Sequence, residues 1–243
     1  MPCFRPLVIS VEGGIGAGKS TLLQLLKRLF NGKMGIAFVD EPADEWIREG
    51  FLAGMYDGSI SAAAFQLMVL QSLAGDLLKV VASDRPAVII TERSPFSNYR
   101  VFSKANLSGQ DLRMYEFTWR RVMGGPLTEL DVRFLYLDVG VDAVKLRIAE
   151  RSRDCESSVS DAYLEKIHRL HDEWLSTEDK CFRLDASRDK DVVLKDALSQ
   201  ISKWMLEAGS MEVASRERKT ERRSEQENAE ILRELSAACG LSG

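Results

Sequence analysis

One short segment constrains this chain more than any other. Residues Gly13-Gly14-Ile15-Gly16-Ala17-Gly18-Lys19-Ser20 match the pattern G-x-x-x-x-G-K-[ST] in full. The segment follows a continuous apolar run at residues 7–11, typical of a buried parallel strand, and precedes an amphipathic helical pattern. Its glycines let backbone N–H groups turn inward around a phosphate, and the helix N-terminus adds partial positive charge. The segment predicts a nucleoside triphosphate site, with Lys19 at the β- and γ-phosphates and Ser20 on Mg²⁺.

Composition narrows the possible partners. The 243 residues carry 33 Lys and Arg against 37 Asp and Glu, and 45% are apolar. This is a globular mixture for one large domain or two small ones, and it excludes a mostly disordered or collagen-like chain. A slightly acidic chain is a poor candidate for binding DNA, and its apolar runs are too short to span a bilayer. We therefore expect neither nucleic acid nor a membrane as a partner.

The four cysteines, Cys3, Cys155, Cys181 and Cys239, are scattered and form no C-x-x-C pair. A disulfide framework or a zinc site needs clustered spacing. The first six residues also lack the apolar segment of a secretory signal. We expect reduced thiols and a cytoplasmic location.

Strand-like and helical patterns alternate along the chain. After residues 7–11, apolar runs recur at 36–39, 88–91, 134–137 and, more weakly, 181–184. Helical patterns separate them, the longest over 61–82. This alternation is typical of βαβ units with right-handed crossovers. The sequence predicts an α/β fold with a five-stranded parallel sheet flanked by helices on both faces.

The character of the sequence changes near residue 208. Residues 191–208 form an amphipathic helical pattern, whereas from 215 to 234 almost every residue is charged or polar. We expect one domain over residues 1–208 and a charged tail over 209–243, either helical or disordered. A partner-binding or oligomerisation helix is the alternative role for the tail.

Three classes of protein use such a phosphate-binding loop: small-molecule kinases, ATP-driven transport or mechanical proteins, and GTP switches. The switch is disfavoured because the chain has no N-K-x-D base-reading motif. Residues 107–110 (L-S-G-Q) resemble a shortened signature of ABC transporter ATPases, and residues 134–138 resemble a Walker B strand. However, the second signature glycine is missing, and Val139 stands where that class has a catalytic Glu.

The kinase interpretation rests on charged residues that directly follow two strands. D-E-P-A-D-E-W starts at Asp40, and T-E-R-S starts at Thr91. Ligands of open α/β sheets bind beyond the carboxyl ends of the strands, so the glycine-rich loop, Glu41, Glu92 and Arg93 should converge on one crevice. A phosphate cradle, a carboxylate near the metal, a base and a cation suit phosphoryl transfer to a hydroxyl.

The order of the motifs resembles the deoxynucleoside kinase family. E-G-G-I-G-A-G-K-S-T is followed by E-P-x-x-x-W, F-Q, E-R-S and Y-L-E-K-I-H-x-x-H-x-x-W-L, over about residues 7–184. The family includes deoxycytidine, deoxyguanosine and mitochondrial-type thymidine kinases and the insect broad-specificity enzyme. The resemblance implies a P-loop kinase fold with a helical lid at about 147–158. It also implies an enzyme of nucleotide salvage that uses ATP and Mg²⁺ to phosphorylate the 5′-hydroxyl of a deoxynucleoside.

The resemblance further implies roles for individual residues. Glu41 would be the general base for the 5′-hydroxyl, Arg93 would bind near the 5′-oxygen and the transferring phosphate, and Glu92 would hold Mg²⁺ with Ser20. The catalytic set is Glu41, Arg93, Lys19, Arg151 and Arg153. The nucleotide-binding set is Gly13, Gly14, Ile15, Gly16, Ala17, Gly18, Lys19, Ser20, Thr21, Arg147, Arg151 and Asp185.

The nucleoside would lie against aromatic side chains. The resemblance implies that Trp46 and Phe65 wall its pocket and that Phe102 stacks on the base. Gln66 would make a paired hydrogen bond to the base edge, because an amide offers both a donor and an acceptor. Core packing is the alternative role for the aromatic side chains, and a helix-surface position is the alternative for Gln66.

Two residues would contact the 3′-hydroxyl, Tyr56 and Glu156. The segment from Tyr56 to Gln66 is one residue shorter than in the family members compared. Arg147, Arg151 and Arg153 share about one helical face of the lid, as a clamp on the triphosphate or as a solvated basic face.

Two positions bear on the choice of base. Members that prefer deoxycytidine or purine deoxynucleosides typically have Arg and Asp where this chain has Leu73 and Asn98, and thymidine-accepting members have Met and Ala there. Apolar Leu73 leaves room for a 5-methyl group, which favours thymidine and deoxycytidine or a broad range. A purine preference through Asn98 is the opposing interpretation.

Two other functions were weighed. Thymidylate kinases share the P-loop and a similar acidic-Arg motif, but a monophosphate acceptor needs no base such as Glu41. A regulatory protein without catalysis is disfavoured by the intact Lys19, Ser20, Glu41 and Arg93. The resemblance also implies a homodimer, formed through long helices.

Overall fold

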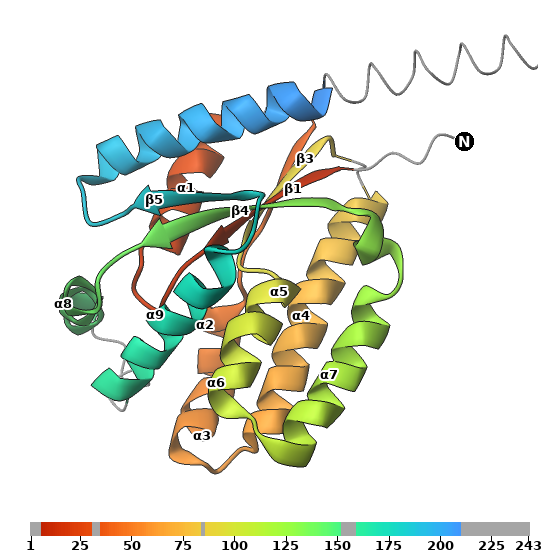
Figure 1. The fold of residues 1–243 in the computed structure, drawn as a ribbon, viewed down its shortest axis with the longest axis vertical. Helices are drawn as coiled ribbons and strands as arrows, with labels where there is room; N and C mark the ends of the chain where they lie inside the picture. Colours follow the sequence, from red (N-terminus) through yellow and green to blue (C-terminus); the bar gives the residue numbers. More distant parts are fainter. Residues whose placement is uncertain (1–5, 31–34, 84–85, 152–158, 210–243) are drawn as a thin grey trace, which may run out of the picture. The chain divides into compact units, whose positions relative to one another are not determined.

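The computed structural model describes residues 6–30, 35–83, 86–151 and 159–209 (Figure 1). The chain divides into two compact units, residues 1–200 and 201–243. Residues 190–200 of the first unit are helical, and so are the described residues 201–209 of the second unit. Residues 210–243 of the predicted tail and residues 152–158 of the predicted lid lie outside the described residues, so the boundary at residue 208 stays a prediction.

The first unit is built on a parallel sheet with the strand order β2-β3-β1-β4-β5. All five predicted strands are confirmed, and their bounds are β1 Leu7–Glu12, β2 Ile36–Val39, β3 Val88–Glu92, β4 Asp131–Asp138 and β5 Cys181–Asp185. β4 begins before its apolar run because Asp131 and Arg133 pair with Leu7 and Ile9 of β1. Hydropathy alone predicted this strand at 134–137, but backbone pairing with the buried β1 extends it to Asp131–Asp138.

Helices connect every pair of consecutive strands. The helices between β1 and β3 are α1 Lys19–Phe30, α2 Ala43–Arg48, α3 Phe51–Asp57 and α4 Ala62–Ser83. Between β3 and β4 lie α5 Pro95–Ser97, the π-helical turn η1 Asn98–Ser103, α6 Lys104–Asn106, α7 Gly109–Met123 and the 3₁₀ turn η2 Pro126–Glu129. Between β4 and β5 lie α8 Val141–Arg151 and α9 Asp161–Leu175.

Apolar side chains cover both faces of the sheet. Val8 and Ile89 pack in one cluster with Leu77 of α4 and Met123 of α7. Side chains alternate along a strand, so their neighbours Ile9 and Ile90 face the opposite side, where they are fully buried. These strands therefore read as unbroken apolar runs, and the sequence prediction of a sheet covered on both faces is confirmed.

The helix α4 is the longest of the described elements, and it matches the helix predicted over 61–82. Among the described residues it alone is long and apolar enough to cross a membrane, with a mean hydropathy of 1.4 over residues 62–82. It packs beside α7 and against β2 (Figure 1), as a core helix of an α/β sheet does.

The carboxyl ends of β1 and β3 lie side by side, because Val11 pairs with Glu92. β1 leads into the glycine-rich loop, and β3 leads into Arg93 and α5. The two motifs that were far apart in the sequence therefore meet at one edge of the sheet.

Candidate active site

The glycine-rich loop joins β1 to α1 in a conformation that only glycine adopts easily. Gly16 and Gly18 have φ values of 74° and 98°, and Gly13 has 149°. A Cβ atom on Gly13 would lie 2.9 Å from the carbonyl oxygen of Leu137, and one on Gly16 would lie 3.1 Å from Ile148. These glycines let the loop pass close to β4 and α8 while it stays open toward the cavity.

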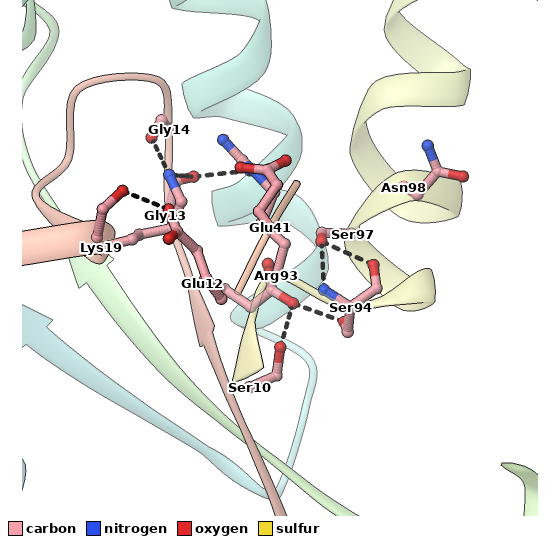
Figure 2. A network of polar contacts seen from close by, with 12 residues as sticks. Ser10, Glu12, Gly13, Gly14, Lys19, Glu41, Arg93, Ser94, Ser97 and Asn98 are labelled. Carbon is pink, nitrogen blue, oxygen red and sulfur yellow. Dashed lines mark hydrogen bonds and ion pairs between the residues drawn. The ribbon is translucent and has the colours of Figure 1, made fainter. Parts of the chain in front are cut away.

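Lys19 is the first residue of α1 and its side chain turns back over the loop. Its Nζ donates to the carbonyl oxygens of Gly13 at 3.2 Å and of Gly14 at 2.8 Å (Figure 2). Burial, together with the nearby Arg93, lowers the pKa of Lys19 to about 8. Because this side chain is only 5% exposed, its ammonium has lost most of its contact with water, and a bound anion would stabilise its charged form.

Ser20 and Glu92 bring two oxygen atoms together at the start of α1 and the end of β3. The Ser20 Oγ donates to Glu92 Oε1 at 2.7 Å. Burial raises the pKa of Glu92, with the neighbouring Lys19 opposing the shift. A hydroxyl and a carboxylate are ligands that Mg²⁺ accepts, so the donor set fits the predicted metal position.

Glu41 and Arg93 form an ion pair at the centre of the site. The Arg93 Nε lies 3.0 Å from Glu41 Oε1 and 3.1 Å from Oε2, and its Nη1 donates to Gly13 at 3.1 Å (Figure 2). Arg93 is the only described non-glycine residue with positive φ, at 62°. This strained conformation directly after β3 turns the guanidinium toward the loop and Glu41.

A cavity of about 930 Å³ opens beside these charged groups. Trp46 of α2 and Phe65 of α4 meet edge to face there, with ring centroids 5.9 Å apart. Phe102 lies on the other side with the Arg93 guanidinium over its ring, 4.4 Å from the centroid. The predicted nucleoside-binding residues that line the cavity are Glu41, Trp46, Tyr56, Phe65, Gln66, Leu73, Arg93, Asn98 and Phe102.

The predicted base-reading residues are joined by buried hydrogen bonds. Asn98 Nδ2 donates to Gln66 Oε1 at 2.7 Å, and the Tyr115 hydroxyl donates to Asn98 Oδ1. Asn98 and Phe102 both lie on the π-helical turn η1, a wide turn that recurs at functional sites. The sequence placed Gln66 and Asn98 at the same base without indicating that they touch.

The helix α8 closes the phosphate end of the cavity. The Arg147 guanidinium donates to the carbonyl oxygen of Ala17 at 3.2 Å and to that of Ala186 at 2.7 Å, which ties α8 to the glycine-rich loop and to the turn after β5. Asp185, the last residue of β5, is exposed and accepts from the backbone N–H of Ser187 at 3.0 Å. Asp185 is not one of the described residues that line the cavity, although its neighbour Ala186 is.

Three predicted residues were not placed by the structure. Arg153 and Glu156 lie outside the described residues, and at Arg151, the last residue of α8, only the backbone is described. Their roles as clamp and as 3′-hydroxyl ligand therefore stay predictions.

Glu12 is a buried carboxyl group that sequence reasoning missed. It is the last residue of β1, is fully buried, and accepts from Ser10 at 2.7 Å and from Ser94 at 2.6 Å (Figure 2). Burial raises its pKa, against the hydrogen bonds of the two serines. Glu12 begins the E-G-G motif quoted above, but the spacing of that motif does not show whether its carboxyl is buried in the strand or exposed in the loop that follows.

Tyr163 of α9 is a second missed residue. It lines the cavity, and its ring meets that of Tyr56 edge to face with centroids 6.3 Å apart. Its hydroxyl accepts from Asn106 at 3.0 Å. Tyr163 begins the Y-L-E-K motif, which contributes to the resemblance to the family, but the motif alone does not indicate a contact with the cavity.

Several known proteins are similar to this chain. A thymidine kinase of Ictalurid herpesvirus 1 is 32% identical over 202 residues, covering 77% of this chain and 82% of the viral protein. Human deoxycytidine kinase is 27% identical, covering 69% of this chain and 74% of the human one. A deoxyadenosine kinase from M. mycoides, solved with bound dATP, superposes with a TM-score of 0.67 at 21% identity, covering 81% of this chain and all of that one, which shows the shared fold.

The family model described as deoxynucleoside kinase matches residues 9–231. That range contains the glycine-rich loop, the Glu41–Arg93 pair and every residue that lines the cavity. The chain belongs to the deoxynucleoside kinase family.

Proposed function

We propose that this kinase transfers the γ-phosphoryl group of ATP to the 5′-hydroxyl of a deoxynucleoside, with thymidine and deoxycytidine preferred. The observation that carries the proposal is the Glu41–Arg93 pair at 3.0 Å, with Arg93 also bonded to the loop that holds Lys19. A carboxylate on the nucleoside side and cations on the phosphate side are what transfer to a hydroxyl requires.

Each charged group has a definite role in this reaction. Glu41 accepts the proton of the 5′-hydroxyl while the hydroxyl oxygen bonds to the γ-phosphorus and the bond to the bridging oxygen breaks, leaving ADP. Lys19 exchanges the carbonyl oxygens of Gly13 and Gly14 for phosphate oxygens. Arg93 binds the transferring group and holds Glu41 in place. A Mg²⁺ ion held by Ser20 and Glu92 would neutralise charge on the phosphates.

The pyrimidine preference rests on the cavity wall and on the relatives. Leu73 is buried in the cluster of Trp46, Phe65 and Val69, so that wall of the pocket is apolar and suits a 5-methyl group or hydrogen. The relatives reported above include a thymidine kinase and a deoxycytidine kinase. The opposing candidate, a purine preference through Asn98, is tested by the same substrate screen.

The assembly that we propose is a homodimer formed through α4 and α7. Residues 62–82 of α4 are strongly apolar, but only 39% of them are buried. Met114 and Phe117 on the neighbouring α7 are 50% and 56% exposed. Light scattering on a sizing column should give twice the mass of 27.2 kDa, and a monomer at micromolar concentration would contradict the proposal.

A substrate screen tests the function directly. Labelled ATP with Mg²⁺ is incubated with each of the four deoxynucleosides, and dTMP serves as the control acceptor. We expect labelled monophosphates, with thymidine and deoxycytidine first. Labelling of dTMP alone would instead assign a thymidylate kinase, and hydrolysis of ATP that ignores nucleosides would favour an ATPase.

A further inference from the structure

Three buried side chains form a continuous line of hydrogen bonds behind the base-binding part of the cavity. Tyr115 of α7 donates to Asn98 of η1, and Asn98 donates to Gln66 of α4 at 2.7 Å. Tyr115 is fully buried, and Asn98 and Gln66 are 1% and 2% exposed. Since bulk water has little access, each atom along this line depends on its neighbour for a partner.

The line has two arrangements in which every contact is satisfied. An amide carries an acceptor oxygen and a donor nitrogen, and a half-turn of the group exchanges them. In the arrangement described, Asn98 turns its oxygen to Tyr115 and its nitrogen to Gln66 Oε1. If both amides turn over, Gln66 Nε2 donates to Asn98 and Asn98 donates to the Tyr115 oxygen. A neutral hydroxyl donates in the first case and accepts in the second.

The two pyrimidines need opposite orientations of an amide. Thymine presents a donor at N3 and an acceptor at O4, whereas cytosine presents an acceptor at N3 and a donor at N4. A glutamine that pairs with this edge must place its oxygen opposite N3 for thymine and its nitrogen there for cytosine. The atom of Gln66 that faces Asn98 therefore differs between the two nucleosides.

We propose that Tyr115 and Asn98 are positioning residues that let Gln66 turn its amide while the Tyr115–Asn98 and Asn98–Gln66 hydrogen bonds are both kept, so that one side chain reads thymine and cytosine. This proposal rests on the proposed function and deepens it, because it names the side chains that let the site accept both pyrimidines. Neither Tyr115 nor Asn98 needs to touch the base.

The residue types suit this role. Burial strongly raises the pKa of Tyr115, which keeps its hydroxyl neutral and able to donate or accept. Asn at position 98 is also reversible, whereas an ionised Asp only accepts, and Ala or Leu does neither. An amide turned the wrong way in this buried line would place donor against donor or acceptor against acceptor, which disfavours that orientation by about tenfold or more.

The first test replaces Asn98 and compares two nucleosides. Asn98→Asp, assayed at about pH 9 so that the buried carboxyl is ionised, fixes Gln66 with Nε2 toward position 98. We expect the ratio of kcat/KM for thymidine to that for deoxycytidine to change by about tenfold or more in one direction, mainly through KM. The control Asn98→Leu removes both donor and acceptor, so both nucleosides should lose affinity and the ratio should stay within about threefold.

The second test moves the ratio the other way. Tyr115→Phe leaves one end of the Asn98 amide without a partner, and a buried carbonyl tolerates this better than a buried N–H group. Asn98 should keep its oxygen toward the ring and its nitrogen toward Gln66, opposite to the orientation that Asn98→Asp imposes. We expect a shift of about threefold in the opposite direction, which also serves as the test if Asn98→Asp does not fold.

The outcomes separate this proposal from the proposed function. A wild type that phosphorylates no nucleoside refutes both. A wild type that phosphorylates only one of the two pyrimidines overturns the reversible line and leaves the kinase function intact. Equal losses for both nucleosides in Asn98→Asp and in Tyr115→Phe would mean that the three side chains only support the pocket. The proposal is supported if the ratio of kcat/KM shifts in opposite directions in Asn98→Asp and Tyr115→Phe and stays unchanged in Asn98→Leu.

Discussion

The two ends of the cavity are built in different ways. The end that we assign to the phosphates is formed mainly by one continuous segment, residues 13–20, in which glycines shape the backbone and Lys19 bonds to carbonyl groups of its own loop. The nucleoside end comes from side chains on α2, α4 and η1, such as Trp46, Gln66 and Asn98. A backbone cradle binds any triphosphate, whereas side-chain contacts distinguish one acceptor from another. The fold thus separates the general part of the reaction from the specific part.

The largest expected effect falls on the general end. Lys19→Ala should lower kcat/KM by about 10³-fold for every nucleoside alike, because it removes the buried ammonium that lies over the glycine-rich loop. Steady-state kinetics with thymidine and deoxycytidine would check this. Lys79→Ala, a change at an exposed lysine of α4, is the matched control. A loss that differed strongly between the two nucleosides would break the comparison.

Glu41 lies where the two ends meet. Glu41→Gln keeps the shape of the side chain but removes the base, so turnover should fall by about 10²-fold while nucleoside binding is retained. Rapid-quench kinetics and equilibrium binding separate the two quantities. Glu49→Gln, at a half-exposed glutamate after α2, is the control. Unchanged turnover would remove Glu41 from this role.

A smaller and selective effect is expected at the specific end. Gln66→Leu removes the paired hydrogen bond to the base and leaves Asn98 without its acceptor. The KM for nucleosides should rise by about 10- to 100-fold while the KM for ATP stays the same. A rise in the KM for ATP would show that the two ends are not independent.

The smallest effect concerns pH at the phosphate end. The pKa of Lys19 is lowered to about 8 by burial, so above that pH the free protein has a largely neutral Lys19. Bound phosphates favour the charged form, so ATP binding should take up a proton above about pH 8, and affinity should fall as the pH rises. Calorimetry in two buffers of different ionisation enthalpy measures the uptake. Lys19→Arg should show none, because arginine stays charged.

The features that could be predicted from the sequence differ from the rest in the same way as the two ends of the cavity differ. The loop, the five strands and the helix α4 were predicted because each is encoded in neighbouring residues by a motif or a hydropathy period. The predicted ends of β2 and β3 also brought Glu41, Glu92 and Arg93 to one crevice, as the rule for open sheets requires. The cavity contains these residues as expected.

The rest could not be predicted because it depends on contacts between distant elements. Tyr115 is separated from Asn98 by 17 residues, and Asn98 from Gln66 by 32. Glu12 is held by Ser94, 82 residues away, and lies on a strand whose other residues, apart from Ser10, are apolar. No local period marks such partners, and a buried polar residue reads in the sequence as an ordinary surface residue or loop residue.

In the proposed function, the two ends form a single site with Glu41 and Arg93 between the two substrates. The measurement that tests it most directly is the binding of adenosine and thymidine joined through a tetraphosphate, which can occupy both ends at once. We expect it to bind at least about 10²-fold more tightly than ATP or thymidine, and to be displaced by either of them. An analogue that is displaced by ATP but not by thymidine would contradict the claim.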